Sequence, residues 1–331
     1  MKKFFLLLFC LFAFSGYAQK QDKTGIPDFN GYIQVRAASN FDSYTGFALR
    51  RLKLWLKSKP GFSDHWSYKV QVTFSSYAQE KIFLQDVFLQ YKWRNSELRF
   101  GQFVPRYSLE RFQHDYLIAP LERARAVNIL IPNGTIGVRD LGLQYNLRAV
   151  NNRLLFNMGL FNGFGIKTYQ FNNKGYMITQ NISYEIPVSS SSIKVGFSTM
   201  FRKAENLYLI GILPDTVAYT GNEFRFNVYG LFSSRFVDVQ GEYLQAKLQN
   251  TTAYGYYGLA TVKLNENNHL YLMYDRYQNE YSSSLSNPWY IAGYNYFFKG
   301  YKIMLTFQTG FQQSNSGWEN RTSLQFQMFF K

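Results

Sequence analysis

The chain is poor in the residues that form disulfides, metal sites and catalytic centres. Its 331 residues include one cysteine, Cys10, and three histidines, His65, His114 and His269. A single cysteine excludes a disulfide framework and thiolate metal sites. The motifs G-x-S-x-G, H-E-x-x-H, G-x-G-x-x-G and the P-loop are also absent, so no nucleophile elbow, zinc protease helix or phosphate cradle is indicated. We therefore expect neither an enzyme nor a bound cofactor or metal.

The first residues predict a secretory signal peptide over residues 1–18. Lys2 and Lys3 precede an apolar run over residues 4–14, and small residues precede a cleavage position after Ala18. The run is shorter than the ~20 residues of a membrane-spanning helix, and no later stretch approaches that length. Cleavage would leave a chain without cysteine that carries 34 basic and 21 acidic side chains, a formal charge of +13.

Aromatic residues are abundant, and apolar residues alternate with polar ones along many segments. The chain holds 27 Tyr and 32 Phe, yet its mean hydropathy is only −0.27. Residues 51–57 (RLKLWLK) place Leu52, Leu54 and Leu56 on one face and cations on the other. This period of two predicts strands. A soluble sheet would bury the apolar face against a second layer, whereas a barrel in lipid exposes it. The signal peptide and the aromatic content favour the barrel.

Alternating segments divide the chain into about sixteen strands, the even number expected of a single-chain bacterial barrel. Short turns follow even strands, and the longer loops, at 105–134, 162–174 and 203–221, follow odd strands. This predicts one domain over residues 19–331, a transmembrane antiparallel β-barrel in the outer membrane of a Gram-negative bacterium. The expected strands span 29–38, 47–58, 65–76, 81–94, 96–104, 135–148, 152–161, 175–186, 191–202, 222–232, 234–247, 254–264, 268–279, 288–298, 300–312 and 319–330.

The loop over residues 105–134 is the longest gap between strands, and loops of such length are usually functional. We interpret it as the third extracellular loop, folded inward to constrict a pore. Its charges are mixed, so they could either line the pore or pair with one another, as Glu110–Arg111 and Glu122–Arg123, to fix the loop. The candidate constriction residues are Arg106, Glu110, Arg111, Glu122, Arg123 and Arg125.

Cations in the middle of strands are predicted to face the lumen, because a lipid-facing Arg or Lys at the bilayer midplane costs ~2–4 kcal/mol. The basic excess is also uneven: residues 19–161 carry a net charge of +9, and residues 162–331 carry +4. A wall lined by one sign of charge enriches counter-ions, and rings of Arg or Lys are typical of anion pores. We therefore expect a channel for small anionic solutes. Strand alternation assigns Arg36, Arg51, Lys53, Lys57, Lys69 and Arg99 to the pore lining.

Several segments resemble the phosphate-selective porin O/P family of outer-membrane porins. They are the pair Arg50-Arg51, residues 84–93 (LQDVFLQYKW) with 98–103 (LRFGQF), residues 121–128 (LERARAVN) and residues 136–142 (IGVRDLG). The resemblance implies a homotrimer of sixteen-stranded barrels with arginine- and lysine-lined pores. It adds Arg50 to the pore lining and places Asp86 on the inner face. Residues 104–134 contain no lysine, however, which favours general anion diffusion over phosphate selectivity.

Other interpretations of the sequence make different predictions. A non-conducting barrel could serve as a receptor or structural protein, with the long loop closing the lumen. An outer-membrane hydrolase could use His114-Asp115, although an exposed loop histidine is the favoured interpretation of that pair. Nucleic-acid binding is disfavoured because the aromatics alternate along strands, as in membrane girdles. Expected partners are outer-membrane lipid and, because the terminal Phe329-Phe330 resembles its recognition signal, the barrel-assembly machinery.

Overall fold

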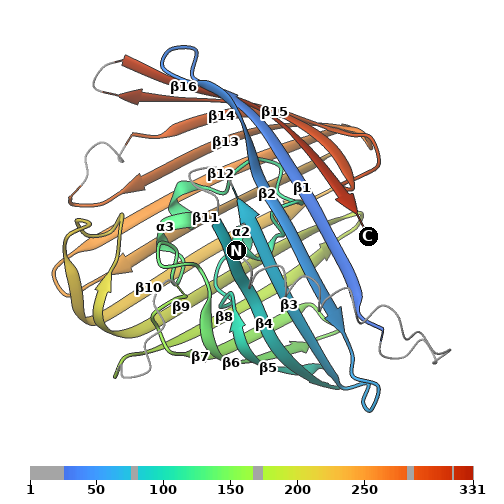
Figure 1. Cartoon of the computed structure of the whole chain (residues 1–331), viewed down its shortest axis with the longest axis vertical. Coiled ribbons are helices and arrows are strands. Elements are labelled where there is room, and N and C mark those ends of the chain that lie inside the picture. The colour runs from blue at the N-terminus through green and yellow to red at the C-terminus, as the bar shows by residue number, and fades with distance from the viewer. Residues whose placement is uncertain (1–25, 76–80, 167–173, 282–286, 315–316, 331) are drawn as a thin grey trace, which may run out of the picture.

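The computed structural model describes residues 26–75, 81–166, 174–281, 287–314 and 317–330, which form one closed antiparallel β-barrel (Figure 1). Each strand pairs with its neighbours in sequence, and β1 closes the barrel by pairing with β16. The predicted signal peptide over residues 1–18 lies outside the described residues.

Sixteen strands build the barrel, and two short helices, α2 and α3, lie between β5 and β6. The helices span Leu109–Phe112 and Arg125–Leu130. The strands are β1 Asp28–Ser39, β2 Thr45–Ser58, β3 Trp66–Ser75, β4 Lys81–Trp93, β5 Ser96–Phe103, β6 Asp140–Ala149, β7 Leu154–Phe161, β8 Tyr176–Val188, β9 Ser191–Tyr208, β10 Ala218–Ser233, β11 Val237–Lys247, β12 Thr252–Asn265, β13 Asn268–Gln278, β14 Trp289–Phe297, β15 Ile303–Ser314 and β16 Gly317–Phe330.

The predicted fold class and strand count are confirmed, with two differences in boundaries. Residues 135–139, predicted to begin the sixth strand, are not extended, because Gly137 and Val138 adopt φ of 104° and 68°. The segment between β5 and β6 therefore covers 104–139. The predicted loop over 203–221 is shorter, because β9 and β10 extend into it on both sides and leave residues 209–217.

The two faces of the wall differ as the alternation predicts. Apolar side chains point outward and remain exposed, such as Leu272 at 65% and Leu160 at 54% exposure. Polar side chains such as Gln327 and Asn227 point into the lumen and are fully buried. No described helix is long and apolar enough to cross a membrane. The outer face is thus suited to lipid, and the inner face to polar contacts.

Two β-bulges turn consecutive polar residues to the same side of the wall. In β2 the register with β1 shifts between Gln34 and Val35, which pair with Arg51 and Leu49. Arg50 is the extra residue, so Arg50 and Arg51 both reach the lumen. In β4 a similar shift opposite Gln71 turns Gln85 and Asp86 inward together. A bulge inserts one unpaired residue and breaks the period of two.

The connections differ between the two ends of the barrel. Residues 59–65, 94–95, 150–153, 189–190 and 266–267 are among the short connections at one end, here called the turn end. The opposite end, here called the loop end, carries the segment 104–139 and the other connections that follow odd-numbered strands.

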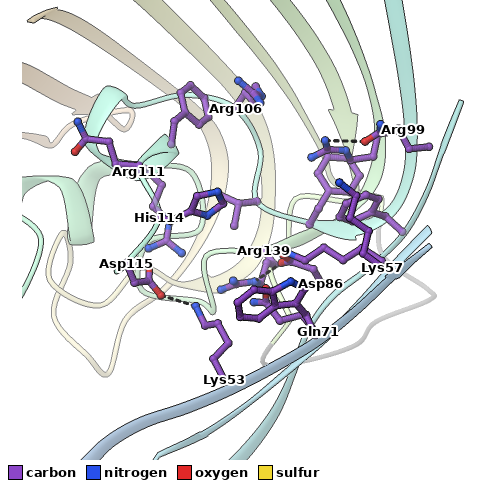
Figure 2. Close-up of a pocket in the computed structure, with 18 of the residues that line it drawn as sticks. Lys53, Lys57, Gln71, Asp86, Arg99, Arg106, Arg111, His114, Asp115 and Arg139 are labelled. Atoms are coloured by element: carbon purple, nitrogen blue, oxygen red, sulfur yellow. Dashed lines mark hydrogen bonds and ion pairs between the residues drawn. The ribbon is translucent and has the colours of Figure 1, made fainter. Parts of the chain in front are cut away.

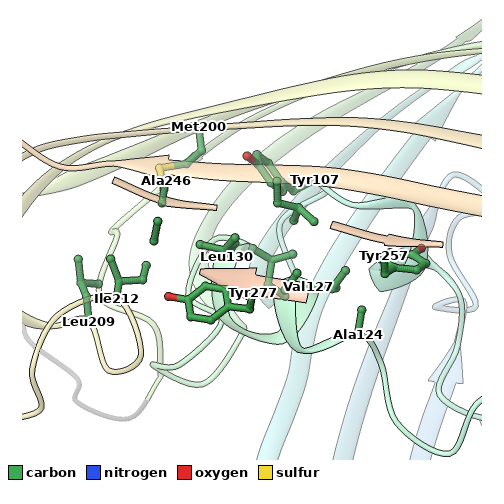
Figure 3. Packing of buried hydrophobic residues seen from close by; sticks show 14 of the residues in the cluster. Tyr107, Ala124, Val127, Leu130, Met200, Leu209, Ile212, Ala246, Tyr257 and Tyr277 are labelled. Carbon is green, nitrogen blue, oxygen red and sulfur yellow. The ribbon is translucent and has the colours of Figure 1, made fainter. Parts of the chain in front are cut away.

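The segment 104–139 lies inside the barrel, where α2 and α3 are enclosed by the wall (Figure 1). Helix α3 contacts β11, β12 and β13. Its Val127 and Leu130 are fully buried beside Tyr277 and Ile212 (Figure 3). This apolar cluster fills the part of the lumen next to β9–β13. The larger spaces that remain lie between the segment and the wall formed by β1–β5, and a smaller one lies against β10–β15.

Candidate functional site

Glu242 on β11 fixes the start of α2 to the wall. Its fully buried carboxylate accepts hydrogen bonds from Ser108 Oγ (3.0 Å) and from the backbone N–H groups of Leu109 (3.1 Å) and Glu110 (2.6 Å). The side chains of Asn227 and Tyr257 donate to the same carboxylate at 2.6 and 2.9 Å. The first N–H groups of a helix have no partner within the helix, so Glu242 satisfies donors that would otherwise be buried unpaired.

Asp275 on β13 fixes the start of α3 to the wall in the same way. It accepts from the backbone N–H of Arg125 at 2.7 Å and from that of Ala126 at 3.4 Å. At the end of the segment, Asp140 accepts from Asn133 Nδ2 at 2.8 Å and from Gly163 N at 2.9 Å. Buried carboxylates of the wall thus hold the segment at three points.

A buried ion cluster on β9 and β10 holds the middle of the segment. Arg202 Nε lies 3.3 Å from Glu223 Oε2, and Arg225 contacts the other oxygen of the same carboxylate. Arg202 donates to Asn133 Oδ1 at 2.9 Å, and Arg225 donates to the carbonyl of Ile131 at 2.7 Å. These arginines serve to dock the segment.

On the opposite side of the segment, Asp115 receives three cations. Arg123 of the same segment lies 2.7 Å from its Oδ1, while Arg51 (3.1 Å) and Lys53 of β2 contact its Oδ2. Burial opposes ionisation of Asp115, but Lys53, Arg51 and Arg123 outweigh it and hold the pKa of that carboxyl well below its ordinary range. Asp115 is therefore a carboxylate that ties the segment to β2.

Two further carboxylates organise the remaining cations of the wall. Glu122 accepts from Arg50 Nε at 2.7 Å and from Arg36 Nη1 at 2.8 Å. Asp86 lies between Lys69 Nζ (2.8 Å) and Arg139 Nε (2.9 Å), as Figure 2 shows for Arg139. Each carboxylate thus pairs with two cations, so each of these groups of three side chains carries a net charge of +1.

Two cavities lie between the segment and the wall of β1–β5, one towards each end of the barrel, and a third of about 170 Å³ lies against β10–β15. The turn-side cavity has a volume of about 410 Å³ and is bounded by Trp55, Lys57 and Ser67 near the turn end. The loop-side cavity has a volume of about 680 Å³ and is bounded by Arg50 and Ser75 near the loop end. The side chains that line both cavities are Arg111, Asp115, Arg123 and Arg139. These four residues separate the two cavities, and the place where they do so is here called the constriction.

Three cations of the turn-side cavity have no carboxylate partner within the described part of the chain. Lys57, Arg106 and Arg111 make no side-chain ion pair there, and Arg111 Nε is buried without a hydrogen-bond partner. Arg106 instead lies 4.7 Å from the ring of Phe112. Burial and then the charge of Arg123 lower the pKa of Arg111. Figure 2 shows Arg106 and Arg111 on the segment side and Lys57 on the wall side of this cavity.

The structure brings most of the predicted site residues to these two cavities, but not all. Arg36 is 5% exposed and is used to hold Glu122 and Gln325. Glu110 is buried behind the segment, and Arg125 donates to the carbonyl of Asn287 on the far side. The remaining predicted residues line a cavity: Arg50, Arg51, Lys53, Lys57, Lys69, Arg99, Arg106, Arg111, Glu122 and Arg123.

The expected pairs of neighbouring charges within the loop, Glu110–Arg111 and Glu122–Arg123, are not the ones that form. Glu122 pairs with Arg36 and Arg50, not with Arg123, and Glu110 accepts from the backbone N–H of Ala124 at 3.0 Å. Adjacent residues on an irregular segment point to different sides, so the pairs form with the wall instead. Sequence reasoning also missed Arg139, Glu242 and Asp275 as site or docking residues. The sequence pointed to Arg139 only indirectly. It lies next to Asp140 within residues 136–142, one of the stretches that resemble the porin O/P family.

The three histidines have separate surroundings. His65 contacts the carbonyl of Lys92 at the turn end, and His269 packs against Phe297. His114 stacks on Tyr116 with ring centroids 5.0 Å apart. Across the described ranges, no group of three His, Cys, Asp or Glu side chains could hold a metal ion.

Glu110 gives the docked segment a predicted dependence on pH. Its side chain is fully buried and one oxygen has no partner. Burial, opposed by Arg123 and aided by Glu242, raises the pKa of Glu110 to about 8. The stability that the neutral form contributes is complete below the ordinary pKa of a glutamic acid and is lost as pH rises through 8. We expect open-channel noise in planar bilayers to increase between pH 7 and 9.5, and Glu110→Gln to remove that increase. An unchanged pH response in the variant would contradict this role.

Comparison with known proteins agrees with this geometry. Residues 28–164 match the model of the family described as phosphate-selective porin O and P. The fold is that of an outer-membrane porin. The matched region covers β1–β7 and the whole inward segment, which contains the constriction. The predicted family resemblance is therefore confirmed over these residues, and an outer-membrane porin channel is supported. No curated protein matches the sequence.

Solved porin structures share the barrel at low sequence identity. The anion-selective porin from Comamonas acidovorans has a TM-score of 0.63 at 12% identity, covering 92% of this chain and 99% of that chain. The trimer form of in-vitro folded OmpT from Vibrio cholerae has a TM-score of 0.61 at 12% identity, covering 93% and 100%. DcaP, an outer membrane channel of Acinetobacter baumannii, has a TM-score of 0.60 at 13% identity, covering 94% and 99%. At these identities the likeness establishes the fold.

Proposed function

We propose that this porin forms a passive, water-filled diffusion channel that prefers small anions. The observation that carries the proposal is the charge of the two cavities. Ten Lys and Arg side chains line them, against three carboxylates, Asp86, Asp115 and Glu122. A narrow passage with low-dielectric walls and one dominant sign of charge concentrates counter-ions.

The composition of the inward segment supports general anion diffusion over phosphate specificity. Residues 104–134 contain no lysine, and Lys53 and Lys69 of the wall are both paired with carboxylates. Small anions, phosphate among them, are therefore the proposed solutes.

We place the loop end outside the cell and the turn end in the periplasm, because outer-membrane barrels carry short periplasmic turns and longer outer loops. Export would use residues 1–18 as the signal peptide, and membrane insertion would use β16, which ends at Phe330. A homotrimer is supported by the trimer form of the OmpT structure. Outer-membrane lipid would contact the outward apolar faces of the strands that the trimer leaves uncovered.

The decisive experiment is single-channel recording of the purified protein in planar bilayers under a KCl gradient. We expect ohmic current steps. We also expect a reversal potential whose sign shows that chloride permeates more readily than potassium. Added phosphate should reduce the chloride current without abolishing it. Cation selectivity would refute the proposal, and silence of a correctly folded barrel would favour a non-conducting receptor or structural protein.

A further inference from the structure

We propose that the turn-side cavity selects organic anions with a flat apolar body, of the aromatic carboxylate class, over inorganic anions of equal charge. This inference rests on the proposed anion channel and names the class of solute that its turn-side half recognises. It is carried by the combination of aromatic rings with unpaired cations in a single cavity.

The rings are concentrated on one side of the constriction. Seven Phe, Tyr and Trp side chains line the turn-side cavity, among them Trp55, Phe88 and Phe112. Only Phe83 lines the larger loop-side cavity among the residues described there. Tyr68 alternates with the inward Lys69 and is set aside; the other six rings point into the lumen, so they cannot belong to a lipid-facing aromatic girdle. A hydrated inorganic ion gains nothing from such rings, whereas an aromatic or other flat solute stacks on them.

Two arginines of the cavity lack a carboxylate partner among the described residues, so either could receive the carboxylate of a solute. Arg111 and Arg106 both project from the segment, and neither side chain has a carboxylate partner among the described residues. Arg106 already lies over the ring of Phe112 at 4.7 Å, and Arg99 lies over that of Phe88 at 4.4 Å. A guanidinium next to a ring offers charge-assisted hydrogen bonds to a carboxylate and a flat surface to the group attached to it.

The size of the cavity fits a small organic solute. Its volume of about 410 Å³ lies within the ~300–1,000 Å³ range of sites for small molecules. Such sites combine apolar walls with a few placed polar groups. The cavity opens on one side towards Lys57 and is bounded on the other by the constriction residues Arg111 and Arg139. A solute held there would lie directly on the path between the two ends of the barrel.

The test compares benzoate with acetate, two anions that share a carboxylate and differ in the ring. Binding to the full chain in detergent is measured by calorimetry, and block of chloride current is measured in bilayers. We expect benzoate to bind and block about tenfold more tightly than acetate, the gain expected of one or two ring contacts. The double variant Phe88→Leu, Phe112→Leu should weaken benzoate more than acetate and bring the ratio of the two affinities close to one. Tyr290→Leu, at an exposed outward position, is the matched control and should keep the preference.

The outcomes separate the inference from the proposed function. An anion-selective channel that binds benzoate and acetate equally would overturn the inference and leave the function standing. Failure of anion selectivity would overturn the function, while calorimetry would still decide whether the cavity prefers the ring. If the double variant does not fold, Trp55→Leu replaces it, since Trp55 lines the same cavity from β2. A ring preference that survives loss of these rings would also refute the inference.

Discussion

The double variant Arg51→Gln, Lys53→Gln is expected to lower the ratio of anion to cation permeability at least about fivefold. One unit charge 4 Å from an ion changes its energy by about 1 kcal/mol even at the dielectric constant of water, which corresponds to about fivefold in local concentration. Both cations contact Asp115 at the constriction. Their removal therefore subtracts two positive charges and also leaves a carboxylate with Arg123 as its closest ion-pair partner. The reversal potential under a KCl gradient measures the change.

The matched control for this variant is Lys59→Gln. Lys59 lies in the β2–β3 turn, is 60% exposed and pairs with Asp64 at 3.1 Å, far from the constriction. It removes a cation from the same hairpin but should leave the permeability ratio unchanged, because exposed charges are screened within ~8 Å at physiological salt. Equal shifts in the control and the double variant would mean that net charge, not the constriction, sets selectivity.

The alternation of the sequence was sufficient to predict the wall and most of its inward cations. Lys53, Lys69 and Arg99 follow the period of two, and the cost of exposing a cation to lipid fixes their direction. The rule fails where the register shifts. Arg50 and Arg51 are consecutive and cannot both face the lumen of a regular strand, yet the bulge in β2 turns both inward. Only the family resemblance pointed to that pair.

The inward segment could be located from the sequence, but its contacts could not. Its length and charge indicated a constriction, whereas the partners of Glu122, Arg36 of β1 and Arg50 of β2, are 86 and 72 residues away along the chain. The sequence also carried no sign of which residues accept hydrogen bonds from the backbone N–H groups of the segment. Glu242 and Asp275 are ordinary inward residues by alternation, and their role depends on where the N-termini of α2 and α3 lie. Such pairings follow from the tertiary structure and leave no local pattern.

Charge is divided between two tasks within one lumen. On the side of β9–β13, Arg202, Arg225 and Glu242 are fully or almost fully buried and fix the segment in place. On the side of β1–β5, cations outnumber carboxylates and border the cavities. Docking to β9–β13 holds the segment with groups that do not border the path. On the other side, Asp115 and Glu122 pair with only some of the cations, so a surplus of positive charge remains close to the path.

Glu242→Gln is therefore expected to release the segment and to enlarge the conductance. The carboxylate accepts five hydrogen bonds, from Ser108, Leu109, Glu110, Asn227 and Tyr257. An amide of the same size has one acceptor oxygen, and its own N–H groups would meet donors. Two of the five donors are bound by one oxygen alone, and each buried donor left unpaired costs about 1–3 kcal/mol, so docking should weaken by at least about 2 kcal/mol. We expect larger and noisier single-channel steps and faster proteolysis within 104–139.

The barrel itself should survive this substitution, because its ladder of backbone hydrogen bonds does not involve the side chain of Glu242. Resistance to heating in detergent, read from gel mobility, is expected to match that of the unaltered protein. Glu319→Gln is the matched control: Glu319 is an exposed carboxylate on β16 that takes no part in docking. If Glu242→Gln keeps the original conductance, noise and protease resistance, the segment is held by its apolar cluster around Val127 and Leu130, and the buried carboxylates do not determine the width of the pore.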